Sequence, residues 1–408
     1  MAARSRKIAV FIAPETGGYA VDPDADGSGG LYKPVKILGN VGFPADNLEK
    51  IDTNYQRGVN RITRQEIGAD GAALELEMPL QGFDVAAGDG GSVPATDAQD
   101  LIFAAAFGAA TANTGEGVDT TSGAATLAVE TGDPLAAQDL APVQGASTNS
   151  ARTQWRHVTG SATPWTIDRN WDDVPGGSEV LYGTRQWSPN DTGGGDSLAC
   201  YVQIDGTAYT LLGGRPTALK ITMAAGQIAR LAVSIQFDSK TRGAKGTEPT
   251  IASSTIAGLP IKGMLSGFIW NDLTATGGSD FTARQVELDF GLAADVRSSI
   301  AGAQGRANIE VISANPTITV DPIHADLWED EFRADPPTPR EVMISFGAGT
   351  LAGGRVNTCA FYAAAAEITA AGDADDNGRI RKQITARVVD AGELSSGVDY
   401  NYWRFARA

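Results

Sequence analysis

Two neighbouring segments alternate between apolar and polar side chains, and this alternation constrains the fold more than any other feature of the chain. Leu219, Ile221 and Met223 fall on one face of the first segment, and residues 231–237 repeat the pattern. A period of two residues is typical of a strand with one buried face. A turn-forming run at 224–226 lies between the segments, which therefore predict an antiparallel hairpin in a mainly β fold.

Similar strand signals recur along the chain between turns rich in glycine, of which the sequence has 49. Residues 73–78 alternate apolar side chains with glutamate, and we expect them to pair with residues 61–67 through a turn at Asp70-Gly71. Together with the first hairpin, these signals predict strands at 7–13, 35–43, 61–67, 73–78, 219–223, 231–237, 260–270, 283–290, about 307–312 and about 317–321.

Two segments carry helical signals. Residues 97–107 follow Thr96, which can cap a helix, and have two aspartates in the first turn, where carboxylates suit the helix dipole. The body is apolar nearly all round, so we expect other elements to bury it on both sides. The second helix is expected at about 322–333, capped by Asp321, with a proline at its first position.

The two halves of the chain resemble each other. Leu219–Gly226 aligns without gaps to Val342–Gly349, with apolar residues at the first, third and fifth positions and an identical closing Ala-Gly. This predicts two similar β-rich units, each with one packed helix. The first comprises residues 1–110 and 201–250, and the second residues 251–408.

Residues 111–200 differ in composition from the rest. They are rich in threonine, glycine, serine and aspartate. They also carry four of the seven tryptophans, namely Trp155, Trp165, Trp171 and Trp187. Leaving four such side chains in water would cost considerable free energy. We therefore expect an inserted, peripheral subdomain in the first unit instead of a flexible linker.

Charge and cysteine content restrict the function and the compartment. The formal net charge is 32 − 49 = −17, which argues against a protein that grips nucleic-acid phosphates with lysine and arginine. An acidic wall is still compatible with DNA sliding past it. Cys200 and Cys359 are the only cysteines, so we expect two buried thiols in a reducing compartment. Apolar runs are too short for a signal-peptide core or a membrane span, and we expect synthesis in the cytoplasm and no membrane partner.

Motifs for catalysis or cofactor binding are weak. His157 and His324 are the only histidines, and no Gly-x-Ser-x-Gly sequence accompanies them. Residues 347–353 approach a dinucleotide-binding fingerprint, but they have one extra residue before the last glycine, and too few residues follow for a doubly wound sheet. A hairpin turn is the better interpretation. We expect no catalytic residues, no cofactor and no enzyme activity.

Two acidic turns have the spacing that opens a calcium-binding loop. The bidentate glutamate expected at the twelfth position is Lys33 in the first turn and Ile384 in the second. We therefore interpret both as ordinary acidic turns and leave weak calcium binding open. The residues concerned are Asp22, Asp24 and Asp26 in the first turn, and Asp373, Asp375 and Asn377 in the second.

Several segments resemble the tail tube (major tail) proteins of long-tailed, non-contractile phages. Glu15-Thr-Gly-Gly-Tyr19, the Asp/Gly-rich loop after it and residues 35–56 are similar to the amino-terminal region of that family. Gly71–Pro79 and the helix at 101–108 fit its strand–helix step. The hairpins closing at Gly226 and Gly349, together with the turn at 376–378, resemble its recurrent hairpins.

This resemblance implies an assembly. Tail tube domains are small β-barrels or sandwiches flanked by a helix; they form rings whose inner strands join into one barrel, and the rings stack into a tube. The resemblance therefore implies a structural virion protein that assembles in the host cytoplasm around a tape-measure protein, meets tail terminator and distal tail proteins, and later conducts DNA. The duplication favours a homotrimer with a pseudo-sixfold lumen, and a homohexamer is the alternative.

Two other functions remain open from the sequence. One is a different virion or surface-lattice protein, such as a capsid decoration or an S-layer-like protein. The other is a carbohydrate-binding β protein that uses the tryptophans of residues 111–200 as stacking platforms.

Overall fold

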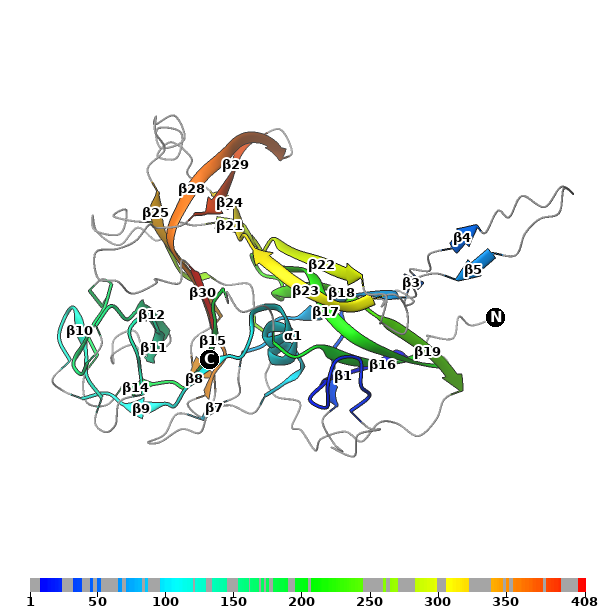
Figure 1. Ribbon diagram of the computed structural model, residues 1–408. Coiled ribbons are helices and arrows are strands. Elements are labelled where there is room, and N and C mark those ends of the chain that lie inside the picture. The colour runs from blue at the N-terminus through cyan, green and yellow to red at the C-terminus, as the bar shows by residue number, and fades with distance from the viewer. Residues whose placement is uncertain are drawn as a thin grey trace, which may run out of the picture.

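A computed structural model gives the fold of the chain (Figure 1). It describes residues 8–23, 32–38, 45–46, 50–52, 65–67, 71–82, 85–86, 96–119, 122–129, 134–144, 153–160, 162–168, 170–171, 174–175, 179–189, 195–204, 207–244, 260–261, 265–270, 283–298, 306–322, 339–347, 350–351, 355–376, 379–389 and 403–408. The fold is mainly β, as predicted, and its pairings are antiparallel.

One series of strands is built around a long central strand. Antiparallel pairing runs in the order β1–β16–β17–β18–β6–β3, and β19 pairs with the first half of β17. We call this the first strand series. Its members are β1 (Ile8–Pro14), β3 (Ala45–Asp46), β6 (Ala72–Pro79), β16 (Leu198–Ile204), β17 (Thr207–Ala224), β18 (Arg230–Phe237) and β19 (Ser239–Ala244).

A second series repeats the same order later in the chain. Pairing runs β20–β25–β28–β29–β24–β21, and β30 pairs with the first half of β28. We call this the second strand series. Its members are β20 (Leu265–Trp270), β21 (Ala283–Asp289), β24 (Thr317–Pro322), β25 (Arg340–Phe346), β28 (Cys359–Asp376), β29 (Arg379–Val388) and β30 (Trp403–Arg407).

Each series also carries a hairpin at the same place in its strand order. The first has β4 (Lys50–Asp52) paired with β5 (Gln65–Ile67), between β3 and β6. The second has β22 (Leu292–Ser298) paired with β23 (Arg306–Ala314), between β21 and β24. The same strand order therefore occurs twice, including the connection by hairpin.

The correspondence extends to single residues of the two long strands. Counted from the first residue of β17 and β28, Thr217 and Thr369 hold the same position, and each lies at a β-bulge. Thr217 Oγ1 donates to the carbonyl oxygen of Ser234 at 3.3 Å, and Thr369 Oγ1 donates to that of Thr385 at 3.2 Å. Because a bulge fixes the local twist and register, this match aligns the two strands without gaps.

That alignment corrects the sequence match between the halves. Leu219–Gly226 belongs to β17 and the turn after it, whereas Val342–Phe346 belongs to β25, whose counterpart in the first series is β16. Both segments bury their apolar face, as Leu219 and Val342 show. They matched because apolar residues at every second position recur in strands of different position, including β25, which is buried on both faces at Val342–Phe346. The period does not say which strand of a sheet it belongs to.

The leading hairpin is confirmed, but a second predicted pairing is wrong. β17 and β18 pair as expected, with Gly226 at φ 76° in the turn. The strand expected at 73–78 exists as β6, yet it pairs with β18 and β3, while β5 pairs with β4. β18 is as long as β6 and presents its own alternating apolar face, so pairing with it buries more surface than a local hairpin would.

The strand expected at 35–43 is also largely wrong among the described residues. Extended pairing occurs instead at β2 (Lys33–Pro34), which lies against β1. Residues 35–38 follow without strand pairing, although Leu38 N–H donates to the carbonyl of Glu77 at 2.7 Å. Residues 39–43 lie outside the described ranges.

The predicted first helix is α1 (Ala98–Phe107), and Gly108 ends it. Its cap is Asp97, not Thr96. The Asp97 carboxylate accepts from the Asp100 N–H at 2.9 Å, and the Asp100 carboxylate accepts from the Asp97 N–H at 3.2 Å. This reciprocal capping box satisfies two backbone donors at once, which Thr96 could not do from one position earlier. The second expected helix lies outside the described residues except for Pro322, which ends β24.

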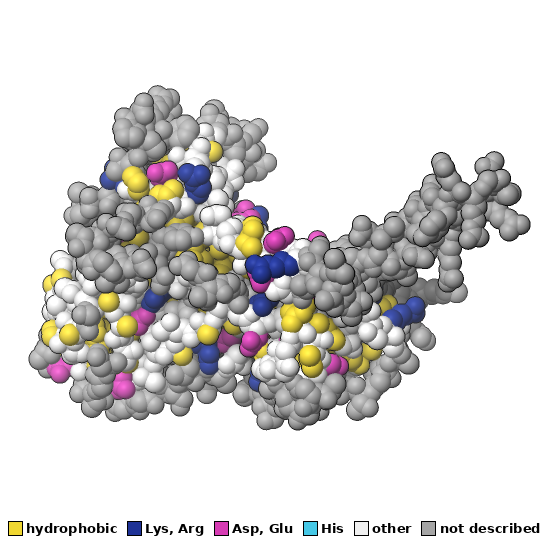
Figure 2. All heavy atoms as spheres, in the orientation of Figure 1, with side chains coloured by type: hydrophobic (Ala, Val, Ile, Leu, Met, Phe, Trp, Pro, Cys, Tyr) yellow, Lys and Arg dark blue, Asp and Glu magenta, His cyan; other side chains and the backbone are white. Residues whose placement is uncertain are grey.

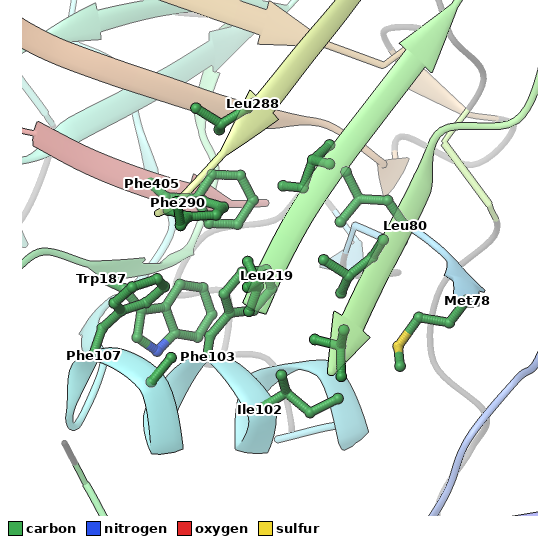
Figure 3. Close-up of a cluster of buried hydrophobic side chains, with 14 of the residues drawn as sticks. Met78, Leu80, Ile102, Phe103, Phe107, Trp187, Leu219, Leu288, Phe290 and Phe405 are labelled. Carbon is green, nitrogen blue, oxygen red and sulfur yellow. The ribbon is translucent and has the colours of Figure 1, made fainter. Parts of the chain in front are cut away.

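Aromatic side chains from β30, from the residue after β21 and from Trp187 meet on α1 (Figure 3). Phe103 lies 4.9 Å from Phe405 and 5.0 Å from Trp187 between ring centroids, and Phe107 lies 5.1 Å from Phe290. Each fully buried aromatic contributes roughly 1.5–3 kcal/mol, and each ring pair about 0.5–1.5 kcal/mol more. The helix is buried on several sides, as predicted, and the two series share one hydrophobic core.

Much of the segment with four tryptophans has its own small core. Val118, Val143, Trp165 and Leu181 belong to a cluster whose members all lie between residues 118 and 181. Its strands are β9 (Glu116–Gly117), β10 (Thr126–Leu127), β11 (Leu140–Gln144), β12 (Thr153–His157), β13 (Trp165–Thr166) and β14 (Val180–Leu181).

The remaining strands connect these parts. β8 (Thr111–Asn113) and β15 (Thr184–Trp187) pair with each other, and β15 continues onto β30. β7 (Val85–Ala86), β26 (Thr350–Leu351) and β27 (Arg355–Val356) form a small sheet. The pairings of the described strands never return to their starting strand, so these residues form no closed barrel within one chain. Of the expected barrel or sandwich, the closed barrel is therefore not seen.

The described surface carries charges of both signs. On the face shown in Figure 2, basic side chains lie beside acidic ones, without a continuous basic patch over the described atoms. Among the described residues, no helix is both long enough and apolar enough to cross a membrane.

Candidate assembly site: the junction between the two strand series

The two series join where a strand of the second lies along the central strand of the first. Residues 220–224 of β17 pair antiparallel with residues 285–289 of β21. Beyond the ladder, Phe290 N–H donates to Leu219 O at 3.0 Å, and Ala225 N–H donates to Arg284 O at 2.9 Å. A strand edge left open presents unpaired backbone groups, and β21 satisfies those of β17 here.

Side chains add to this backbone pairing. Lys220 Nζ lies 2.5 Å from Glu287 Oε1, and both side chains are partly exposed. An exposed ion pair of this kind contributes little to stability, about 0–1 kcal/mol. Its position on neighbouring strands favours the observed register over slipped ones.

The β22–β23 hairpin packs at the same junction. Ile309 and Val311 are buried, and Leu292 packs against the large core. The Ile309 N–H donates to the hydroxyl of Tyr19 at 3.0 Å, and that hydroxyl donates to the carbonyl of Gly213 at 3.3 Å. The hairpin of the second series therefore rests on residues of the first.

The turn that leads into this hairpin requires glycine. Gly291 has φ 55°, and a Cβ at this position would lie 2.2 Å from the carbonyl oxygen of Asn315. Its N–H donates to Asp289 Oδ1 at 2.9 Å. The close approach of the two chain segments thus leaves no room for a side chain.

Glu15 organises the loop that holds Tyr19. The Glu15 carboxylate is buried and accepts from the N–H groups of Gly213 at 2.7 Å and Ala20 at 2.8 Å, and from the Ser197 hydroxyl. Burial raises the pKa of Glu15, and these hydrogen bonds offset part of the rise. Burial likewise raises the pKa of Tyr19, so its hydroxyl stays protonated.

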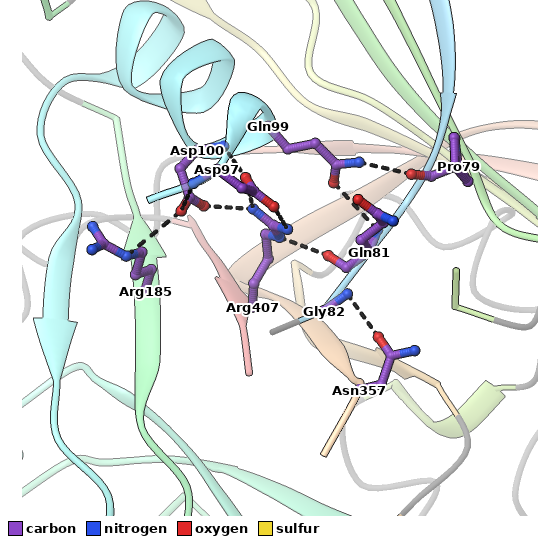
Figure 4. A network of polar contacts seen from close by, with 9 residues as sticks. All are labelled: Pro79, Gln81, Gly82, Asp97, Gln99, Asp100, Arg185, Asn357 and Arg407. Atoms are coloured by element: carbon purple, nitrogen blue, oxygen red, sulfur yellow. Dashed lines mark hydrogen bonds and ion pairs between the residues drawn. The ribbon is translucent and has the colours of Figure 1, made fainter. Parts of the chain in front are cut away.

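A buried ionic network ties the last strand to the helix (Figure 4). Arg407 on β30 is fully buried; its guanidinium lies 2.8 Å from Asp97 Oδ2 and 2.5 Å from Asp100 Oδ1, and it donates to the Gln81 carbonyl at 2.8 Å. Arg185 approaches Asp100 at 3.6 Å. Two carboxylates at a helix N-terminus also interact favourably with the helix dipole.

The two carboxylates of this network titrate differently. Burial raises the pKa of Asp100 to about 7, the neighbouring Asp97 charge adds to the rise, and Arg407 and Arg185 oppose it. Burial would also raise the pKa of Asp97, but the charge and hydrogen bonds of Arg407 outweigh burial and lower it. Asp97 is therefore the permanent partner of Arg407, and Asp100 is the group that can hold a proton near neutrality.

The sequence-predicted calcium turns are only partly described. Asp22 accepts from the Tyr32 hydroxyl at 3.3 Å, and Asp24 and Asp26 lie outside the described residues. Asp373 and Asp375 lie on β28, with Asp373 opposite Lys382 in the ladder, and Asn377 lies outside the described residues. Within the ranges that the structure covers, no cluster of three or more His, Cys, Asp or Glu could hold a metal ion. Calcium binding stays a prediction.

The two histidines and residues 347–353 are the remaining candidates from the sequence. His157 is buried and stacks on Tyr362 with 4.0 Å between ring centroids, and His324 lies outside the described residues. Within 347–353, the described residues include β26, which pairs antiparallel with β27 just after this range, while residues 348–349 and 352–354 lie outside the described residues.

The predicted buried thiols are confirmed. Cys200 and Cys359 are free and buried, and burial raises the pKa of both thiols, that of Cys359 to about 12. The four tryptophans of residues 111–200 are at most 5% exposed. They are therefore not available as stacking platforms for a carbohydrate.

Sequence reasoning missed the junction and the Arg407 network. The partners of Arg407 lie about three quarters of the chain away in sequence, and no local pattern connects them. The aspartates in the first turn of the helix were a partial signal. Glu15-Thr-Gly-Gly-Tyr19 was identified as a family feature, and the structure shows that this segment contacts and supports the β22–β23 hairpin.

Comparison with known proteins agrees with this architecture. The family model described as phage tail tube protein matches residues 5–387 of the chain. A search of curated proteins found no match. Since the matched region covers nearly all 408 residues, the chain belongs to the phage tail tube protein family and is a structural subunit of the tail of a phage virion.

Proposed function

We propose that three copies of the chain form one ring of the tail tube, with the two strand series of each chain supplying two of six similar units around the lumen. The observation that carries this proposal is the strand order that occurs twice and is joined once by the β17–β21 pairing. A ring of identical heterologous contacts closes when the rotation between units divides a full turn. A homohexamer, in which each chain supplies one sixth of the lumen, is the alternative.

The division of the chain follows from the same observation. Residues 1–110 with 201–250 form the first tube domain, and residues 251–408 form the second. The segment 111–200 is the peripheral insertion. β15 and the first residues of β16 lie inside that segment but join the large sheet. The independent part of the segment is therefore narrower and has its core between residues 118 and 181.

The tube has few partners in this scheme. Rings stack on further copies around a tape-measure protein, and terminator and distal tail proteins close the ends. DNA passes through without specific binding, which a net charge of −17 supports because acidic walls repel phosphates. We assign no catalytic role and no cofactor to the chain.

Electron microscopy of the purified protein tests the proposal. Class averages viewed down the tube axis should show three outer lobes around a lumen of sixfold appearance. Six equivalent outer lobes would support the homohexamer and contradict the trimer. A protein that stays monomeric at high concentration, and also in the presence of its tail partners, would contradict the tube itself.

A further inference from the structure

The distal half of β17 has a neighbour on both edges, whereas the equivalent half of β28 does not. Along one edge of β17, β19 pairs with the first half and β18 with the distal half. Along the other edge, β16 pairs with the first half and β21 with the distal half. Along one edge of β28, β30 pairs with the first half and β29 with the distal half. Along the other edge, β25 pairs with the first half. Among the described strands, none lies where the counterpart of β21 would be, beside residues 369–376.

That counterpart exists elsewhere in the chain. β3 pairs with β6 as β21 pairs with β24, and it is followed by the β4–β5 hairpin as β21 is followed by β22–β23. We call β3, β4 and β5 the arm. In Figure 1 the β4–β5 hairpin extends from the right end of the molecule, and the β28–β29 hairpin stands out separately at the top of the view.

We propose that the arm of one copy pairs with the open edge of β28 in the next copy, repeating between chains the contact that β21 makes with β17 inside one chain. This rests on the proposed function, because it names the contact that closes the ring. It is heterologous, since two different surfaces meet, and each chain offers one of each. The same proposal explains why both surfaces are without described partners in a single chain.

The repeated ladders fix the register of this contact. In β17, Lys220 faces Asp289, and the corresponding residue of β28, counted from the start of the strand, is Gly372. Ala45 corresponds to Asp289, because Ala45 pairs with Ala73 as Asp289 pairs with Thr317. Ala45 of one copy should therefore face Gly372 of the next.

The face of the sheet beside the open edge is exposed at Thr369, Ala370 and Gly372. A Cβ built on Gly372 would meet nothing within 4 Å, so a side chain introduced there has room. Leu219 and Ala225 direct backbone groups toward β21. Because every second residue of a strand faces the same neighbour, residues 221 and 223 do so too. Asp373 corresponds to Ile221, so its N–H points toward the open edge of β28.

Engineered disulfides test the register directly. Lys220 and Asp289 flank the hydrogen-bonded pair of Leu219 and Phe290, so they form a non-hydrogen-bonded pair, whose Cα atoms lie about 4.5 Å apart and suit a disulfide. The double variant Ala45→Cys/Gly372→Cys should give a covalent trimer on a non-reducing gel after oxidation of assembled protein. Thr369→Cys in place of Gly372→Cys puts the thiol out of register and should give none.

An internal control shows that the geometry works. Lys220→Cys/Asp289→Cys should form a disulfide within one chain and leave the mass on the gel unchanged. If that control closes and rings are visible by microscopy, but Ala45→Cys/Gly372→Cys stays uncrosslinked, the inference is wrong and the tube function stands. A covalent hexamer would support the contact and contradict the trimer. Absence of rings in every sample would contradict the proposed function.

A backbone substitution provides a second test. Asp373→Pro removes the N–H that faces the open edge, which an unpaired edge tolerates and a paired strand does not. Its melting temperature as a monomer should match that of the wild type, and ring formation should be lost. Rings of normal yield with this variant would overturn the inference. A large drop in the melting temperature of the monomer would show that this edge is already paired within the chain, with the same consequence.

Discussion

Arg407 on the last strand lies 2.8 Å from the carboxylate of Asp97, the residue that caps the helix near the start of the chain. This contact joins a strand of the second series to the helix that follows β6 of the first. Phe405, two residues before Arg407 on β30, packs on Phe103 of α1, so the ion pair lies next to the shared core.

Removing Arg407 should therefore destabilise the fold severely. Arg407→Ala leaves the Asp97 carboxylate without its counter-charge and leaves Asp100 with Arg185 alone, at 3.6 Å. Breaking a buried ion pair in this way costs about 3–5 kcal/mol. Thermal unfolding should show a large fall in melting temperature or insoluble protein. Arg387→Ala, at an exposed ion pair with Glu367, is the control and should change stability by less than about 1 kcal/mol. Equal stability of Arg407→Ala and wild type would contradict the assigned network.

Asp100→Asn should change the pH dependence of stability. Because the pKa of Asp100 is raised to about 7, the folded state binds a proton that the unfolded state has already released above about pH 4. The stability that this bound proton adds to the folded state is fully present below about pH 4 and is lost as the pH rises through 7. The variant lacks it, so its melting temperature relative to wild type should be more favourable at pH 8 than at pH 5.

A non-titrating change in the same helix provides the control for this effect. Ile102→Val removes one buried methyl group and costs roughly 0.5–1.5 kcal/mol. Its offset from wild type should be the same at both pH values. If Asp100→Asn behaves in that way too, the carboxyl does not titrate in this range.

Gly291→Ala should weaken the hairpin at the junction. A Cβ would collide with the carbonyl of Asn315, and the positive φ adds strain. We expect a loss of about 1–3 kcal/mol in stability, measured by chemical denaturation. Gly226→Ala has a similar φ but nothing within 4 Å of the new Cβ, so it isolates the cost of φ alone and should lose less. The reverse order would show that the turn relaxes freely.

The buried thiols should be unreactive in the folded protein. Cys200 and Cys359 are fully buried, and their pKa values are raised, so the reactive thiolate is scarce. A thiol reagent should label neither residue in native protein and both after denaturation. Rapid labelling under native conditions would mean that this part of the core opens easily.

Local patterns predicted many of the elements but not all of their partners. The alternation in 219–223 and 231–237 identified a real hairpin, because the two strands are adjacent in sequence and one turn fixes their register. The same kind of pattern in 73–78 identified β6 but assigned it the wrong neighbour. Alternation shows which face is buried, and it carries no information on which distant strand lies alongside.

The candidate site illustrates the same limit. The repeat was visible as a resemblance between halves, yet its clearest sequence match joined two strands that do not correspond. The true correspondence depends on the bulges at Thr217 and Thr369 and on the order of pairing, which only three-dimensional contacts reveal.

The sequence by itself determined a mainly β chain with a buried helix at about 97–107, buried thiols and a resemblance to tail tube proteins, because each of these depends on local periodicity, composition or a short motif. Only the tertiary structure decided that β21 fills the edge of β17 while the same edge of β28 stays open among the described strands. Backbone hydrogen bonding between strands is nearly independent of side-chain identity. The choice of partner therefore rests on the packing of the whole core, which no single segment encodes.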